Sequence, residues 1–266
     1  MPEGDTIFRA ATQLRKALVG ARVTKFESDR LPGPLPVGER IEAVEAKGKN
    51  LIVRFEQGRA LRTHMMMSGS WHIYRAGEKW QRPAWQARVA VHADNGFLAV
   101  CFNAPVVEWL REESIARLGP DATSDSFEPA SALRRLRSLP PQMALGEALL
   151  VQSALAGIGN VIKSEALFRC RADPFARLVE VPDETLRAVI DDSHALLVRN
   201  RGGGPRTSRD SLDGGRLWVY GRSGKPCLVC EASIRMRRQG ATARSTYFCP
   251  TCQCVTASLG PAPQKG

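Results

Sequence analysis

The sequence contains no apolar run long enough to cross a membrane, and its N-terminus lacks the apolar stretch of a secretion signal. It has no internal repeat, and its one biased stretch is a glycine-rich segment at residues 201–215. With 266 residues, of which 43% are hydrophobic and 24% charged, the chain has a globular composition and room for two modest domains. We therefore expect a cytoplasmic bacterial protein with no membrane partner.

Acidic residues are scarce relative to basic ones. The chain has 27 Asp and Glu against 38 Lys and Arg, a net charge of +11. The imbalance is greatest from Arg199 to Arg244, where eleven basic residues accompany three acids. The total charge fits a generally basic surface as well as a polyanion partner. Its concentration in one stretch favours contacts with nucleic-acid phosphates.

The chain has seven cysteines, and the placement of four of them indicates a metal site. Two C-x2-C pairs are separated by eighteen residues; they consist of Cys227, Cys230, Cys249 and Cys252. Without a secretion signal, such pairs are better explained as zinc ligands than as disulfides. Four thiolates saturate a tetrahedral Zn²⁺, so we expect one structural zinc that stiffens a β-hairpin. We expect Cys101 and Cys170 to pack as small apolar groups, and we give Cys254 no role.

The hydrophobic pattern divides the chain into a β-rich part and a helical part. Apolar residues spaced four, three and four apart predict an N-terminal amphipathic helix that ends at Gly20, with Asp5 or Thr6 as its cap. Alternating strands fill residues 22–117, and Asp94-Asn95-Gly96 is a strong hairpin signal. From Ser131 the period becomes helical. The expected fold class is α+β: a helix with an antiparallel β-sandwich, then a helical domain with a β-hairpin zinc finger.

Turn-forming segments set the expected boundaries between these parts. In the second part, helices are expected around Leu133 and Leu136 and over residues 146–155, 162–168 and 182–198. The expected divisions are a β-sandwich domain at 1–120, a linker at 121–131, a helical domain at 132–216, a finger at 217–254 and a tail at 255–266.

The start of the chain has reactive potential. If Met1 is removed, the secondary amine of Pro2 becomes the terminus, with the Glu3 carboxyl beside it. Such an amine attacks an aldehyde carbon and forms an iminium, an electron sink. At a helix N-terminus the macrodipole favours the neutral, nucleophilic amine. The alternative is that Pro2 is an ordinary second residue.

Residues 155–165 read Leu-Ala-Gly-Ile-Gly-Asn-Val-Ile-Lys-Ser-Glu. Gly157 and Gly159 permit unusual backbone shapes and close approach of another chain. Asn160 and the free N–H groups of the helix start suit a phosphate. We assign Lys163, one turn further on, to DNA binding as well. A glycine-rich helix connection with a capping Asn is the alternative.

Together these features resemble the formamidopyrimidine-DNA glycosylase / endonuclease VIII family of base-excision repair enzymes. The Pro-Glu-Gly start, the Gly-Ile-Gly-Asn segment and the four-cysteine finger occur in the family's order, over roughly residues 2–254. Two further stretches resemble the endonuclease VIII branch, particularly its second bacterial subgroup: Leu-Gly-Pro-Asp at 118–121 and Leu-Trp-Val-Tyr-Gly-Arg at 217–222.

The resemblance implies roles for five residues. Pro2 would be the nucleophile at C1′ of the damaged nucleotide, and Glu3 the general acid that opens the deoxyribose ring. Lys49 would contact phosphate at the active site and assist catalysis. Asn160 and Arg244 would bind the phosphates that flank the lesion.

An enzyme of this kind must flip the damaged base out of the duplex and fill the gap. The segment His-Met-Met-Met-Ser-Gly at 64–69 matches the family's void-filling loop, with Met67 as the wedge. Met66 and Ser68 are lesser candidates. Without the resemblance, three methionines at a strand end would be assigned to the core.

The sequence also departs from the family pattern. Thr6 replaces a glutamate, Val151 replaces an aspartate, and residues 103–109 lack the Arg and Phe wedge of the formamidopyrimidine branch. The missing wedge favours the endonuclease VIII branch.

From the motifs and the resemblance together, we predict a monomeric bifunctional glycosylase/AP lyase, in the nucleoid, that acts on double-stranded DNA carrying an oxidised pyrimidine or an abasic site. DNA would lie in a cleft with Pro2 and Glu3 on one wall and Asn160 and Arg244 on the other. An 8-oxoguanine or formamidopyrimidine glycosylase and a non-catalytic zinc-dependent DNA-binding protein are the alternatives.

Overall fold

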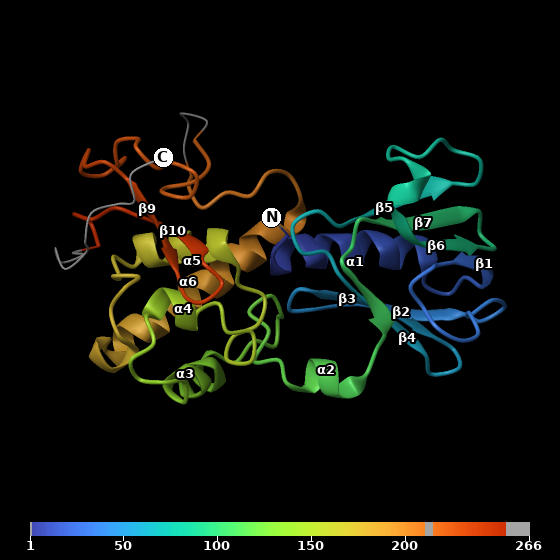
Figure 1. Cartoon of the computed structure of the whole chain (residues 1–266), viewed down its shortest axis with the longest axis horizontal. Helices are drawn as coiled ribbons and strands as arrows, with labels where there is room; N and C mark the ends of the chain where they lie inside the picture. Colours follow the sequence, from blue (N-terminus) through green and yellow to red (C-terminus); the bar gives the residue numbers. More distant parts are fainter. Residues whose placement is uncertain (1, 211–214, 254–266) are drawn as a thin grey trace. The chain divides into compact units, whose positions relative to one another are not determined.

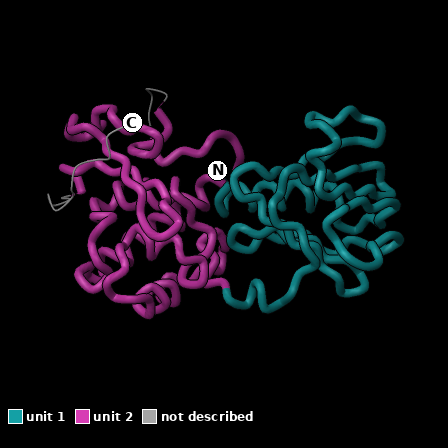
Figure 2. The backbone as a smooth tube through the Cα atoms, viewed as in Figure 1, with its two compact units in different colours: residues 1–117 teal, residues 118–266 magenta. Residues whose placement is uncertain are grey.

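A computed structural model describes residues 2–210 and 215–253, and the chain forms two compact units, residues 1–117 and 118–266 (Figure 2). Each unit has its own hydrophobic core. Met1, Cys254 and the expected tail at 255–266 lie outside the described residues. The elements confirm the predicted α+β class, with a helix and antiparallel sheets followed by helices and a β-hairpin (Figure 1). Over the two described ranges, no helix is long and apolar enough to cross a membrane.

Helix α1 (Gly4–Leu18) is the predicted amphipathic helix, and its apolar face is buried. It begins before the caps that we expected, because the Glu3 carbonyl already accepts the N–H groups of Thr6 and Ile7. Asp5 lies inside the first turn instead, where its Oδ1 accepts the N–H of Thr6 at 2.7 Å. A carboxylate at this position also complements the positive end of the helix dipole.

Unit 1 contains two four-stranded antiparallel sheets. The first has the order β2 (Ile41–Lys47), β3 (Asn50–Phe55), β4 (Ala60–His64) and β8 (Val106–Trp109). The second has the order β1 (Val23–Glu27), β6 (Ala87–Ala93), β7 (Phe97–Phe102) and β5 (Ser70–Arg75). The predicted turn at Asp94-Asn95-Gly96 joins β6 to β7, and Gly96 has the positive φ that such a turn requires.

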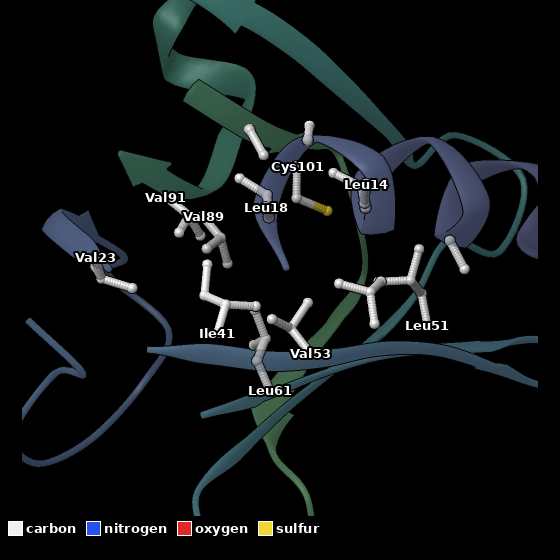
Figure 3. Packing of buried hydrophobic residues seen from close by; sticks show 14 of the residues in the cluster. Leu14, Leu18, Val23, Ile41, Leu51, Val53, Leu61, Val89, Val91 and Cys101 are labelled. Carbon is white, nitrogen blue, oxygen red and sulfur yellow. The ribbon is translucent and has the colours of Figure 1, made fainter. Parts of the chain in front are cut away.

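Apolar side chains from α1 and from both sheets form one core (Figure 3). Leu14 and Leu18 of α1 lie among Ile41 and Val53 of the first sheet and Cys101 of the second. Burial raises the pKa of the Cys101 thiol, so this residue packs as an apolar group. Unit 1 also has two one-turn elements: η1 (Ala84–Gln86) precedes β6, and α2 (Glu112–Ala116) follows β8. Neither was predicted, because a single turn has no periodicity to detect.

Unit 2 is mainly helical. Its helices are α3 (Pro129–Arg137), α4 (Leu145–Ala148), α5 (Asn160–Arg169), α6 (Asp183–Arg199), and the short η2 (Leu178–Glu180) and η3 (Asn200–Gly202). A hairpin of β9 (Arg235–Gln239) and β10 (Arg244–Phe248) packs on α5.

The expected helix at residues 146–155 is wrong beyond α4. The Gln152 side chain explains the turns that follow. Its Nε2 donates to the carbonyls of Leu150 and Ile158, and its Oε1 accepts the N–H of Gly157, each at 3.1 Å. The amide thereby satisfies one carbonyl of the expected helix and two backbone groups just beyond it, and so stabilises the turns.

Candidate functional site

The start of α1 and the β2–β3 turn lie at the same end of unit 1. Helix α1 runs antiparallel to β2, because its C-terminal end bonds to the start of that strand and Nη2 of Arg15 donates to the Val44 carbonyl at 2.7 Å. From Arg15 the helix extends about 18 Å back to Glu3. The strand extends about 10 Å from Val44 to the turn that holds Lys49. Pro2, Glu3 and Lys49 therefore lie at the same end of unit 1, and the Glu3 side chain is fully buried.

His64 belongs to this end as well, because it ends β4 and pairs with Asn50, the residue after Lys49. Burial, aided by the charges of Lys49 and Arg62, lowers the pKa of His64 to about 4. Its Nδ1 accepts the N–H of Met66 at 3.2 Å, so the proton of the neutral ring is on Nε2. The sequence placed His64 in the void-filling segment but gave no sign of this charge state.

The three methionines after His64 have different environments. Met65 is 2% exposed and belongs to the core, whereas Met66 is 46% exposed and Met67 is 76% exposed. Met66 has a φ of 47°, a left-handed conformation that side chains rarely adopt. A Cβ on Gly69 would lie 2.7 Å from the Cα and O atoms of Met65, so this loop can close only over glycine. The loop thus presents Met67 to solvent.

The second group of predicted residues lies where α5 begins. Gly157 has a φ of 97°, and Asn160 is the first residue of α5. The Asn160 side chain is largely buried, and its Nδ2 donates to the Ser245 hydroxyl of β10 at 3.4 Å. The next residue back, Arg244, is exposed at the start of β10. The fold therefore places Asn160 and Arg244 on adjoining segments.

Lys163 is used differently from our prediction. Its side chain is fully buried, and Nζ donates to the Ser245 carbonyl at 3.1 Å and to the Thr246 hydroxyl at 2.7 Å. Thr246 donates in turn to Gln239, whose Nε2 donates to the Pro174 carbonyl at 2.9 Å. Lys163 thus joins α5 to the hairpin.

Glu165 is a second buried anchor, and no sequence pattern indicated it. Its carboxylate accepts the backbone N–H groups of Trp218, Val219 and Tyr220 at 2.8 to 3.0 Å, and also the Ser208 hydroxyl. Such multiple donation stabilises a buried carboxylate. It fixes the segment that leads into the finger against α5.

The four paired cysteines come together as a metal site. Their Sγ atoms lie within 4.8 Å of one another, with 3.8 Å between Cys227 and Cys252 and 3.5 Å between Cys230 and Cys249. Ligands about 2.3 Å from a tetrahedral zinc lie about 3.8 Å apart, so the cluster has the right size for Zn²⁺. Four sulfurs leave no open coordination position. The site therefore fits one structural zinc, as predicted.

Family models match the chain in three segments. They are the formamidopyrimidine-DNA glycosylase N-terminal domain at residues 1–104, the H2TH domain of the same glycosylase at 118–207, and the zinc finger found in FPG and IleRS at 224–255. "Probable endonuclease 8 2" of Streptomyces coelicolor is 39% identical over 276 residues, which cover 100% of this chain and 97% of that protein. "DNA-(apurinic or apyrimidinic site) lyase Nei2" of Mycolicibacterium smegmatis is 35% identical, with 95% and 99% covered.

The chain therefore belongs to the formamidopyrimidine-DNA glycosylase family. The crystal structure of MutM (Fpg) from Thermus thermophilus is similar, with a TM-score of 0.78, 28% identity, and 95% of this chain and 99% of that chain covered. Lactococcus lactis Fpg, non-covalently bound to DNA with an AP site, shares the fold at 20% identity, with a TM-score of 0.78 and 94% and 99% covered. These findings confirm the predicted family and fold.

Proposed function

We propose that this protein is a bifunctional DNA glycosylase and AP lyase of base excision repair that uses Pro2 as its nucleophile and acts on oxidised pyrimidines. The observation that carries the proposal is that the α1 start, with Pro2 and the buried Glu3, and the Lys49 turn lie at the same end of unit 1. Family membership and the endonuclease 8 relatives support the same activity.

The proposed reaction begins once removal of Met1 exposes the Pro2 nitrogen. Its lone pair attacks C1′ of the damaged nucleotide, the bond from C1′ to the base breaks, and the base leaves with the bonding electrons. Glu3 protonates the ring oxygen as the sugar opens, which gives an iminium between Pro2 and C1′. Loss of a C2′ proton then expels the 3′ phosphate, and a second elimination releases the 5′ phosphate. An abasic site enters the same sequence without base release.

Neighbouring groups favour the reactive form of this amine. The N-terminus of α1 carries partial positive charge, which disfavours an ammonium on Pro2. Lys49 would hold a backbone phosphate, and the neutral His64 adds no charge of its own beside it. Met67 would enter the gap left by the flipped nucleotide, because its unbranched side chain is already exposed on a loop closed by Gly69.

DNA binding is assigned mainly to unit 2. Asn160 and Arg244 would hold phosphates beside the lesion, with Lys163 positioning Ser245 beneath them. We assign catalysis to residues 1–120 and DNA binding to 132–216 and to the finger at 217–254, joined by 121–131. The protein would act as a monomer in the nucleoid on damaged or abasic duplex DNA.

Borohydride trapping on abasic duplex DNA tests this proposal. Protein that has lost Met1 should give a covalent adduct, and Pro2→Gly or Met1-retaining protein should not. If the processed protein binds abasic DNA but gives no adduct, it is a non-catalytic zinc-dependent DNA-binding protein instead.

The same assay across lesions tests the substrate class. Because formamidopyrimidine-DNA glycosylases also occur among the relatives, at 31% identity, the rival substrates are 8-oxoguanine and formamidopyrimidines. Faster base release from duplexes with oxidised pyrimidines than from those with 8-oxoguanine is expected. The reverse order would assign the protein to the purine-directed activity.

A further inference from the structure

Exposed hydrophobic residues gather at one end of the β1-β6-β7-β5 sheet. Ser70 begins β5 and Ala87 lies at the start of β6, and both pair with Phe102, the last residue of β7. The segments just outside these strands, at 66–69, 84–86 and 103–105, therefore share this end. Trp85 in the second segment is 73% exposed, comparable with Met67 in the first.

Hydrogen bonds join the Trp85 turn to the Met67 loop. The Ser68 hydroxyl donates to the Asn103 carbonyl at 3.3 Å. Asn103 donates its backbone N–H to the Gln86 carbonyl at 2.8 Å, and its Nδ2 to Oε1 of Gln86 at 2.9 Å. Ser68, next to Met67, and Gln86, next to Trp85, are thus both hydrogen-bonded to Asn103.

The turn that carries Trp85 is braced from several sides. It is η1, preceded by Pro83, whose carbonyl accepts the Gln86 N–H at 3.0 Å. Nη1 of Arg88 donates to the Trp85 carbonyl at 3.0 Å. The structure therefore holds a large aromatic side chain in solvent on a fixed backbone, which suits recognition of a flat partner at low entropic cost.

The local charge indicates what that partner is. Residues 79–88 contain Lys79, Arg82 and Arg88 and no acid. An exposed aromatic ring among positive charges is the combination that binds single-stranded nucleic acid, because the ring stacks on a base while the cations attract phosphates.

We propose that Trp85 stacks on the base opposite the flipped nucleotide, as a second gap-lining residue beside Met67. This rests on the proposed function, since flipping is what leaves that base without its pairing partner. Met67 and Trp85 project from one braced end of the sheet, so the wedge and the stacking platform would be presented together.

Equilibrium binding to duplexes with a non-cleavable abasic analogue tests the proposal without requiring catalysis. Trp85→Ala should weaken binding about tenfold when a base stands opposite the analogue. When the opposite nucleotide also lacks its base, the same substitution should change binding less than about twofold, since the stacking partner is gone. Trp85→Phe should retain most of the affinity, whereas Trp85→Leu should not.

Val37→Ala is the matched control, since Val37 is also exposed, at 56%, but lies between β1 and β2. It should leave binding to both duplexes unchanged. Equal losses on both duplexes, or no loss on either from Trp85→Ala, would overturn the assignment. Wild-type protein that binds these duplexes but fails in borohydride trapping would reject the catalytic proposal alone.

Discussion

The environment of His64 determines its charge state. Burial beside Lys49 and Arg62 lowers its pKa to about 4, whereas an unfolded histidine titrates near 6.5. Between these values the unfolded chain binds a proton that the folded chain does not. This contribution to stability is therefore complete above about pH 6.5 and is lost as the pH falls towards 4.

Urea unfolding near pH 7.5 and near pH 5 measures this effect. The free energy of unfolding should fall more for the wild type than for His64→Gln, which cannot take up the proton. Equal losses for the two proteins would show that His64 titrates normally in the folded chain.

A substitution at Lys163 can distinguish a structural role of this cation from direct binding of a phosphate. In Lys163→Met the Ser245 carbonyl and the Thr246 hydroxyl lose a buried donor, which should lower the free energy of unfolding by about 1–3 kcal/mol. Denaturant unfolding measures this loss, with the exposed Lys225→Met in the same region as the control. The opposite result would be unchanged stability with a salt dependence of DNA binding that is weaker by about one phosphate contact. That result would show that Lys163 binds a DNA phosphate directly.

At the level of elements, periodic and turn-rich segments could be predicted, and irregular ones could not. The α1 face and the Asp94-Asn95-Gly96 hairpin follow from local spacing. The turns after α4 do not, because they depend on three bonds made by the Gln152 side chain. Likewise, no local pattern shows that Glu165 meets three N–H groups more than fifty residues away.

The loop that presents Met67 gives a prediction at this scale. Gly69→Ala places a methyl group 2.7 Å from the backbone of Met65, so the loop must open. Met67 would shift, and affinity for DNA with an abasic-site analogue should fall about tenfold, because each misplaced gap contact costs one or more kcal/mol. Binding titrations measure this. Gly202→Ala is the control, because its added methyl group meets nothing within 4 Å, and it should bind DNA with wild-type affinity. Wild-type affinity in Gly69→Ala would show that this loop does not contact the DNA.

At the level of the whole molecule, the finger region differs from the large cores of the two units in what stabilises it. Unit 1 has a continuous core from α1 and both sheets, whereas the finger region has a small cluster that includes two of the four cysteines. The sequence predicted this contrast, because closely spaced cysteine pairs signal a part that needs a metal. It could not predict that Lys163 and Glu165 would tie the finger region to α5, since those bonds join residues distant in the chain.

Zinc removal should therefore unfold the finger region and leave the core of unit 1 intact. A chelator that extracts the ion leaves four thiolates without their shared cation, and the hairpin that carries Arg244 should lose its order while the unit 1 core persists. We expect DNA affinity to fall at least tenfold, with most far-ultraviolet circular dichroism retained and zinc release measured by a colorimetric indicator. Readded zinc should restore binding, and Cys249→Ser should behave as the chelated protein does. Full DNA affinity after complete zinc release would show that the finger does not hold the phosphate-binding arginine.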